Sequence, residues 1–168
     1  MGYGALLGFL PPYAKAAGMN DAEIGIILGG QLATTMAAKP IGGRLSDRLG
    51  RKPLILIGLL LCVATLPLIA LTQKFALLFV LSAIFGLGVA FVTPSTTALV
   101  ADLAKVGGIG SAMGVFGTIW DFGEALGPIL AGFLIVSIGY FQAFALIGSL
   151  IAFTALIFAK SVKDPQRL

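Results

Sequence analysis

Charged residues are scarce in this 168-residue chain: they make up 11% of the sequence, whereas apolar residues make up 58%. An ordinary soluble domain has about 25% charged residues. A water-soluble fold of this size could not bury so much apolar surface, which excludes a soluble enzyme and a disordered chain. Histidine is absent and Cys62 is the one cysteine. A Cys/His zinc site, an intrachain disulfide and a histidine-dependent triad are therefore excluded, and we expect no metal and no cofactor.

Long uncharged runs take up most of the chain. No charged residue occurs in 53–73, in 75–101 or in 125–159. A helix needs about 20 apolar residues to cross a hydrocarbon core roughly 30 Å thick. The runs show no period-two alternation, and lipid offers no partners for backbone polar groups, so helices are predicted. With Gly139 dividing the last run, we expect six transmembrane helices at Gly2–Ala17, Ala22–Gly43, Pro53–Thr72, Phe75–Ala101, Gly108–Ser137 and Tyr140–Ala159.

The first of these segments is short. Its sixteen residues rise only about 24 Å as a helix, and Pro11 and Pro12 interrupt them. A cleaved signal peptide is the alternative, but the basic residues that such a peptide carries at its start are missing. We therefore expect a membrane helix that lacks its beginning, in a chain that is part of a longer polypeptide.

Lysine and arginine gather on one side of the predicted arrangement. That side holds Arg44, Arg48, Arg51, Lys52, Lys105, Lys160, Lys163 and Arg167, and the other side holds Lys15 and Lys74. The positive-inside rule places the richer side, with both termini, in the cytoplasm of a plasma (inner) membrane. The net charge of +4 is thus an orientation signal. Binding to anionic lipid is the alternative, and no nucleic-acid partner is expected.

Glycine is unevenly distributed among the predicted helices. Pairs of small residues four apart occur at Gly25/Gly29, Gly110/Gly114 and Gly123/Gly127, whereas segments 53–72 and 140–159 hold few glycines. Small residues allow helices to approach closely in lipid. We therefore expect the second, fourth and fifth segments to pack against protein, and the third and sixth to face lipid.

The most distinctive motif connects the second and third segments. Gly43 and Gly50 permit a tight reversal of the chain. Between them, Asp47 can pair with Arg48 or with Arg51. Such a cluster can hold two helix ends together in one conformation and release them in another. The alternative is a simple cationic anchor, which requires neither the aspartate nor the glycine spacing.

This motif resembles the signature of the major facilitator superfamily of secondary transporters, G-x-L-a-D-R-x-G-R-[RK]; the matching residues are Gly43, Leu45, Asp47, Arg48, Gly50, Arg51 and Lys52. In the fifth segment, Gly123, Gly127, Pro128 and Gly132 resemble the family's g-x-x-x-G-P-x-x-G-G element of drug/proton antiporters, with Ala131 in place of one glycine. The resemblance implies one six-helix half of a twelve-helix fold, with a second half as partner. It also implies that Asp102 pairs with Arg48 as a conformational latch.

The resemblance leaves open which half the chain is. Both motifs are usually strongest in the N-terminal half. However, 77–88 lacks the arginine that the resemblance implies for an N-terminal half, and only eight residues follow Lys160. We therefore expect residues 1–168 to form a single unit, the C-terminal half.

Two carboxylates fall inside the fifth segment. Asp121 and Glu124 are three residues apart, and so lie on one helical face. Charged groups in a bilayer cost several kcal/mol, and a low dielectric favours the neutral form of a carboxyl group. Asp121 is our first candidate for proton coupling and Glu124 our second. The alternative is a structural carboxyl group hydrogen-bonded to a neighbour.

A polar stripe runs along the second segment, where Gln31, Thr35 and Lys39 recur every four residues. These residues are candidates for lining a substrate cavity, together with Trp120, whose ring can stack on an aromatic or cationic solute. Lys39 has two alternatives: its ammonium can snorkel to the interface, or it can pair with Glu124 if the second and fifth segments are adjacent.

Together these features predict transport of a small organic solute, as proton-coupled efflux by alternating access. The alternative is a six-helix membrane scaffold or partner-binding subunit that transports nothing. The chain has no nucleophile–base pair and no metal-binding cluster of residues, so an intramembrane enzyme is not expected.

Overall fold

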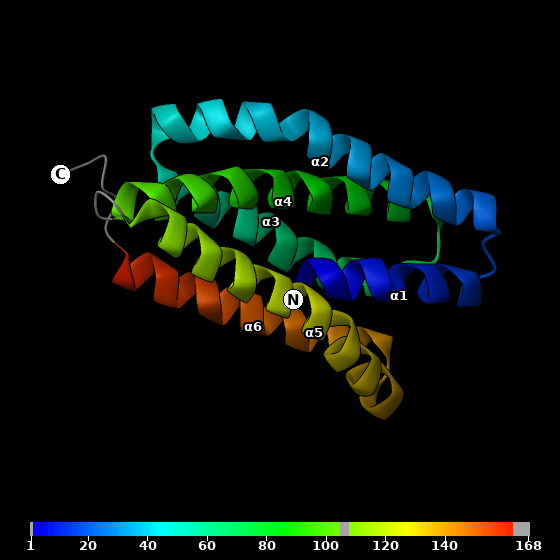
Figure 1. Ribbon diagram of the computed structural model, residues 1–168. Helices are drawn as coiled ribbons and strands as arrows, with labels where there is room; N and C mark the ends of the chain where they lie inside the picture. The colour runs from blue at the N-terminus through cyan, green and yellow to red at the C-terminus, as the bar shows by residue number, and fades with distance from the viewer. Residues whose placement is uncertain (1, 105–107, 163–168) are drawn as a thin grey trace.

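The computed structural model describes residues 2–104 and 108–162. These residues form six helices and no strand, which confirms the predicted fold class (Figure 1): α1 (Gly2–Ala16), α2 (Asp21–Leu49), α3 (Arg51–Leu71), α4 (Phe75–Leu103), α5 (Ile109–Ile138) and α6 (Tyr140–Ser161). Four of them, α3 to α6, are long and apolar enough to cross a membrane. With 15 residues α1 is too short, and α2 carries charges near both ends. Lys105, Lys163 and Arg167 of the orientation argument lie outside the described residues.

The end of α2 differs from the prediction. We expected a loop from Gly43 onward, but the helix continues to Leu49 and α3 begins at Arg51. Ser46 is buried on this extension, so its packing holds the last turns in helical form. The chain reverses at Gly50 alone, where φ is 101°, a value that side-chain-bearing residues avoid.

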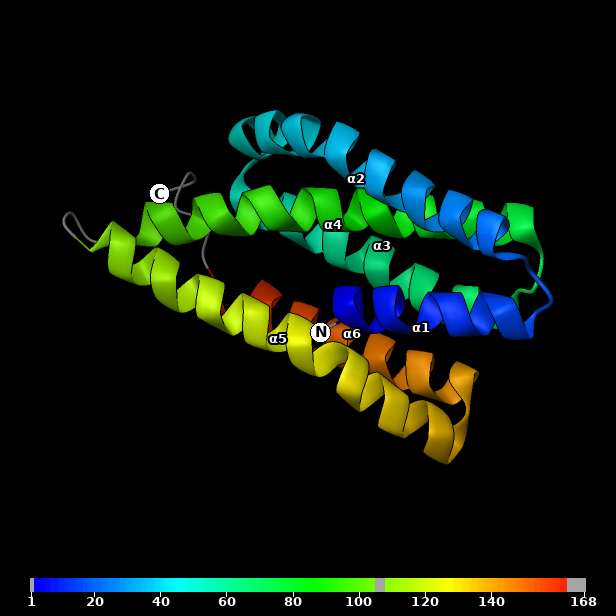
Figure 2. The same ribbon diagram turned by 45° about the vertical axis from the view of Figure 1, so that its right-hand side comes forward.

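The helices form a bundle in which α4 is central. It packs along α2 on one side and α3 on another, α3 packs in turn on α6, and α1 packs on α5 (Figures 1 and 2). The third segment, expected to face lipid, thus packs on two helices, and its remaining side carries the exposed Leu60, Leu68 and Leu71. One glycine on each helix is sufficient for the α3–α4 contact: a Cβ on Gly58 would lie 2.6 Å from the Gly88 carbonyl oxygen, and a Cβ on Gly88 would lie 2.8 Å from that of Gly58.

The glycine pairs singled out in the sequence behave differently. A Cβ on Gly25, Gly29, Gly110 or Gly114 would meet no atom within 4 Å. These positions on α2 and α5 therefore form small-residue faces that no other described helix of this chain covers.

At three helix contacts a glycine of one helix faces a carbonyl that a proline of the other helix frees, and we call such a contact a proline–glycine seam. A proline inside a helix leaves the carbonyl four residues earlier without its N–H partner. Pro94 frees the Ala90 carbonyl, which faces Gly42 of α2, where a Cβ would lie 2.7 Å from the oxygen. Pro128 frees the Glu124 carbonyl, and a Cβ on Gly4 of α1 would overlap that oxygen.

A third seam joins α3 and α6 at a looser fit. Pro67 frees the Val63 carbonyl, and a Cβ on Gly148 would lie 3.7 Å from this oxygen and 3.7 Å from the proline ring. In all three seams the bare Cα of the glycine can approach the freed carbonyl and donate a weak Cα–H···O contact.

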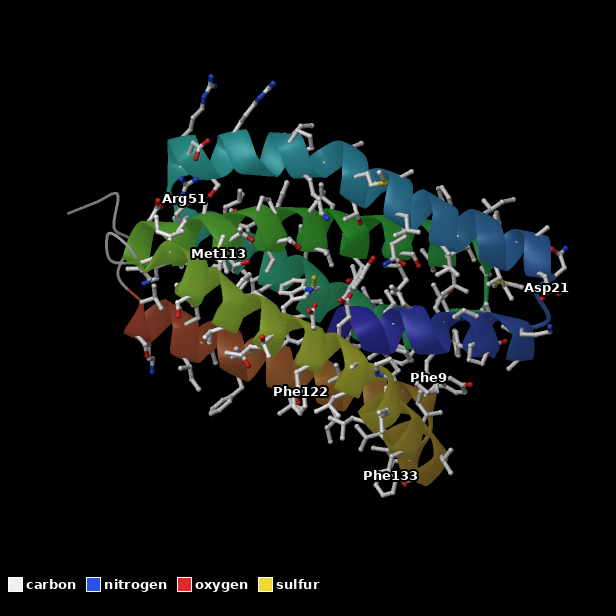
Figure 3. The ribbon with its side chains drawn as sticks, viewed as in Figure 1. Phe9, Asp21, Arg51, Met113, Phe122 and Phe133 are labelled. Carbon is white, nitrogen blue, oxygen red and sulfur yellow. The ribbon has the colours of Figure 1, made fainter. Side chains whose placement is uncertain are left out.

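The two ends of the bundle are held by different contacts. We call the end that holds Gly50 the basic end, and the end that holds the α1–α2 turn the opposite end; Arg51 and Asp21 mark them in Figure 3. At the opposite end, the Tyr13 hydroxyl lies 3.0 Å from the Ala70 carbonyl and 2.9 Å from that of Thr72. The Tyr13 ring also packs on Tyr140, 5.0 Å between centroids. One side chain of α1 thus joins α3 and α6.

Gly42 and its neighbour Gly43 offer a matched test of the α2–α4 seam. We expect Gly42→Ala to lower the free energy of unfolding by about 1–3 kcal/mol, because the new methyl group must displace the Ala90 backbone. Gly43→Ala should leave it unchanged or raise it by up to about 1 kcal/mol, because alanine favours a helix and the site is open. Thermal unfolding in detergent micelles measures both, and equal destabilisation would contradict the seam.

Candidate functional site

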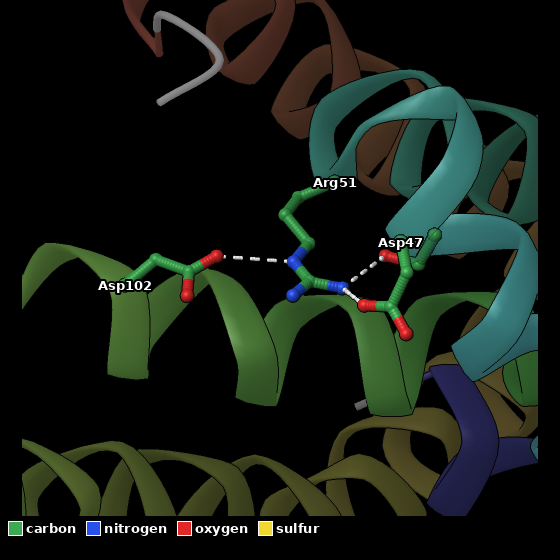
Figure 4. Close-up of polar contacts among 4 residues, drawn as sticks. Asp47, Arg51 and Asp102 are labelled. Atoms are coloured by element: carbon green, nitrogen blue, oxygen red, sulfur yellow. Dashed lines mark hydrogen bonds and ion pairs between the residues drawn. The ribbon is translucent and has the colours of Figure 1, made fainter. Parts of the chain in front are cut away.

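One arginine at the basic end joins three helices. Arg51, the first residue of α3, donates from Nε to Asp102 Oδ2 in the last turn of α4 at 3.0 Å. Its Nη1 pairs with Asp47 Oδ1 in the last turns of α2 and lies 3.3 Å from Ser46 Oγ. Figure 4 shows the guanidinium between the two carboxylates. We call these residues the Arg51 cluster: Asp47, Arg51 and Asp102.

Burial within this cluster is unequal. The Arg51 side chain is 12% exposed, whereas Asp102 is 35% and Asp47 62% exposed. Single exposed ion pairs contribute little, but here one nearly buried cation satisfies two anions from different helices. Asp102 also sits at a helix C-terminus, where the helix dipole disfavours an anion. Arg51 compensates this cost, so loss of the arginine leaves two carboxylates facing each other.

The structure pairs Asp102 with Arg51 rather than with Arg48 as predicted. The reason is topological. Arg48 is exposed on α2, whereas α3 packs directly on α4 and brings its first residue to the end of that helix. Gly50 supplies the reversal between α2 and α3, while Gly43 lies inside α2.

The last residue of the motif binds a different helix. Lys52 Nζ donates to the Ala159 carbonyl of α6 at 2.6 Å. Ala159 is in the last turn of α6, where carbonyls lack helical partners and a cation matches the negative end of the dipole. Arg51 and Lys52 together therefore tie the start of α3 to the ends of α2, α4 and α6.

The two carboxylates of α5 differ in surroundings. Glu124 is half-buried and lines a cavity of about 390 Å³. The cavity wall includes Tyr3, Cys62, Phe85, Phe116 and Trp120. Glu124 supplies the one carboxylate of this wall, whereas Asp121 is exposed and does not contribute to it. Of the two carboxylates expected from the sequence, Glu124 is therefore the one that lines the cavity.

The polar stripe of α2 does not reach this cavity. Gln31 and Thr35 are buried against α4, where the Thr35 hydroxyl lies 3.1 Å from the Gly86 carbonyl. Both amide atoms of Gln31 lack a hydrogen-bond partner within the described part of the chain. Lys39 is exposed. Because α2 packs on α4 and α5 packs on α1, Lys39 forms no ion pair with Glu124 among the described residues.

The glycine–proline element of α5 is a packing surface for α1. Gly127 and Ala131 are buried, a Cβ on Gly8 would lie 3.1 Å from Pro128 Cβ, and a Cβ on Gly132 would lie 2.8 Å from the Phe9 ring. The α1 side of this contact was not expected from the sequence. The signal was present, because Gly4 and Gly8 form a small-residue pair with the same spacing of four.

Comparison with known proteins identifies the same family that the two sequence motifs resemble. A family model described as Major Facilitator Superfamily matches residues 1–168. The quinolone resistance protein NorA of Staphylococcus aureus is 28% identical over 167 residues, which cover 99% of this chain and 43% of NorA. Multidrug resistance protein 1 of Bacillus subtilis is 26% identical over 172 residues, with the same coverage of 99% and 43%. The chain thus spans less than half the length of these relatives.

Arg51 and Arg48 offer a matched test of the Arg51 cluster, because Arg51 pairs with two carboxylates whereas Arg48 is exposed. We expect Arg51→Gln to lower the free energy of unfolding by about 1–2 kcal/mol, because it removes two ion pairs and leaves their carboxylates opposed. Arg48→Gln should change it by less than about 0.5 kcal/mol, as an exposed substitution does. Thermal unfolding in micelles at low salt measures both. A larger loss in Arg48→Gln would restore the pairing expected from the sequence.

Proposed function

The chain belongs to the major facilitator superfamily, and we propose that it forms one six-helix half of a transporter that exports a small organic solute in exchange for protons. Membership in this family makes the chain an integral membrane transport protein and not an enzyme. The observation that carries the proposal is the Arg51 cluster, which links α2, α3 and α4 at one end of the bundle.

Alternating access requires contacts that exist in one state and break in another. The Arg51 cluster suits this role, because its bonds are strong enough to order helix ends and exposed enough to be exchanged for water. In our proposal the basic end faces the cytoplasm. The cluster holds that end in one arrangement, and rocking of the two halves disrupts it.

The cavity and the relatives support an organic solute as substrate. The cavity wall is mainly apolar and aromatic, with Trp120 beside the Glu124 carboxylate. Such a wall suits a solute with an apolar body and a polar or cationic group. The two relatives are named for resistance to quinolones and to multiple drugs, and export of related compounds is what we propose for this protein.

Proton coupling requires a group that gains and loses a proton within the membrane. Glu124 and Asp121 are the two carboxylates inside α5, and we propose Glu124 as the main coupling residue because it lines the cavity. A carboxylate there can bind either a proton or the cationic part of a solute, so that one displaces the other. Asp121 stays a secondary candidate on the exposed face.

A second six-helix half completes this proposal. The uncovered small-residue faces of α2 and α5, which contain Gly25, Gly29, Gly110 and Gly114, are suited to close contact with another helical unit. The chain covers 43% of its relatives, which is compatible with such a partner. We propose that this chain is the C-terminal half, because α4 lacks an arginine in 77–88.

Flux measurements on the complete transporter test this function. We expect inverted vesicles to accumulate a quinolone when a proton gradient is applied. Glu124→Gln should abolish the gradient-driven component, because an amide cannot exchange a proton, and Asp121→Asn should weaken it. Glu23→Gln, at the opposite end, is the control and should transport normally. If the unmodified protein carries no solute, the scaffold alternative holds; undiminished flux in Glu124→Gln would refute the coupling role.

A further inference from the structure

The four cations of the motif divide into two pairs with different surroundings. Arg51 and Lys52 bind the ends of neighbouring helices. Arg44 and Arg48 are exposed and take part in no ion pair within the described residues. Asp47, the carboxylate of the same motif, is engaged by Arg51. Arg44 and Arg48, which we call the outer pair, therefore contribute two positive charges that no carboxylate of the described bundle neutralises.

The outer pair lies at the basic end of an apolar face of α2. Arg44 and Arg48 are one turn apart, on the side of the helix that also carries Ile26, Ala33, Ala37 and Ile41, all of them exposed. Ile26 is 54% and Ile41 60% exposed. Figure 3 shows nitrogen-tipped side chains projecting from this end of α2 away from the other helices. This face matches a phospholipid along its length: the apolar residues suit an acyl chain, and the two arginines beyond them suit the headgroup.

This face is distinct from the small-residue face of the same helix. Gly25, Gly29 and Gly43 lie about a quarter of a turn away around α2, and a Cβ on any of them would meet no atom within 4 Å. The second half proposed above would pack on that glycine face, and this arrangement leaves the arginine face open to lipid.

We propose that Arg44 and Arg48 bind the phosphate of an anionic phospholipid whose acyl chain lies along Ile41 and Ala37. A guanidinium presents a planar fork of donors that matches phosphate oxygens, and two forks one turn apart can hold one phosphate between them. The bilayer supplies this ligand at high local concentration, and each surface arginine strengthens attraction to an anionic leaflet. The inference does not depend on transport.

Lipid titration followed by native mass spectrometry tests this site. The protein expressed from its native gene is purified in neutral detergent and titrated with phosphatidylglycerol or phosphatidylcholine. We expect Arg44→Gln/Arg48→Gln to bind phosphatidylglycerol about 20-fold more weakly. The matched control, Lys15→Gln/Lys74→Gln, removes the same charge at the opposite end and should stay within about twofold of the unmodified protein.

Two further variants complete the test: one separates the effect of charge from that of the guanidinium forks, and the other guards against unfolding. Arg44→Lys/Arg48→Lys keeps the charge and loses the forks, and an intermediate loss is expected. Circular dichroism verifies folding, and Arg48→Gln alone, with an expected loss of about fivefold, provides the result if the double variant unfolds.

Four outcomes overturn the proposal. The first is equal phosphatidylglycerol binding by the arginine and lysine double variants, and the second is equally tight binding of phosphatidylcholine. The third is displacement by millimolar inorganic phosphate, which would show a site for a free anion instead of a lipid. The fourth is loss of lipid binding once the second six-helix half is present, which would show that protein covers the arginines.

Discussion

A backbone carbonyl released by a proline finds no water in a bilayer, and this constraint shapes three helix contacts of the bundle: α2 with α4, α1 with α5 and α3 with α6. At Pro94 and Pro128 the released oxygen faces a glycine of the adjacent helix. Glycine allows the helix axes to approach and shields the oxygen with its own Cα–H. The position of each seam along the helix is thereby fixed, so α2 against α4 and α1 against α5 have one register each. The cavity and the Arg51 cluster depend on that register.

The basic end shows how one short motif can serve several partners. Gly50 turns the chain so sharply that the start of α3 lies beside the end of α2. Arg51 then reaches α4 through Asp102, and Lys52 reaches α6 through the Ala159 carbonyl. Ion pairs suit the opening that we propose for this end, since a packed apolar contact could not be separated in water without a large cost in exposed surface.

The sequence specified the all-helical membrane fold, because uncharged runs of suitable length allow few other structures. It did not identify the partner of Asp102, since which arginine reaches α4 depends on how far α2 continues as a helix. The extension to Leu49 follows from burial of Ser46, a tertiary effect. Likewise, Gln31 looked like a cavity residue because spacing reveals a face but not the neighbour of that face, and α4 covers it.

The proline–glycine seams also have an evolutionary consequence. In the two closest seams the glycine lies against the carbonyl that the opposite proline frees, so we expect the two positions to share a selective pressure across different helices. A Cβ on Gly4 would meet both the Glu124 carbonyl and the Pro128 ring, so we expect a lineage that enlarges Gly4 to change the α5 backbone near Pro128 as well. Such coupled substitutions would indicate which helices are in contact, and they would be visible as covarying pairs of positions among the descendants of this chain.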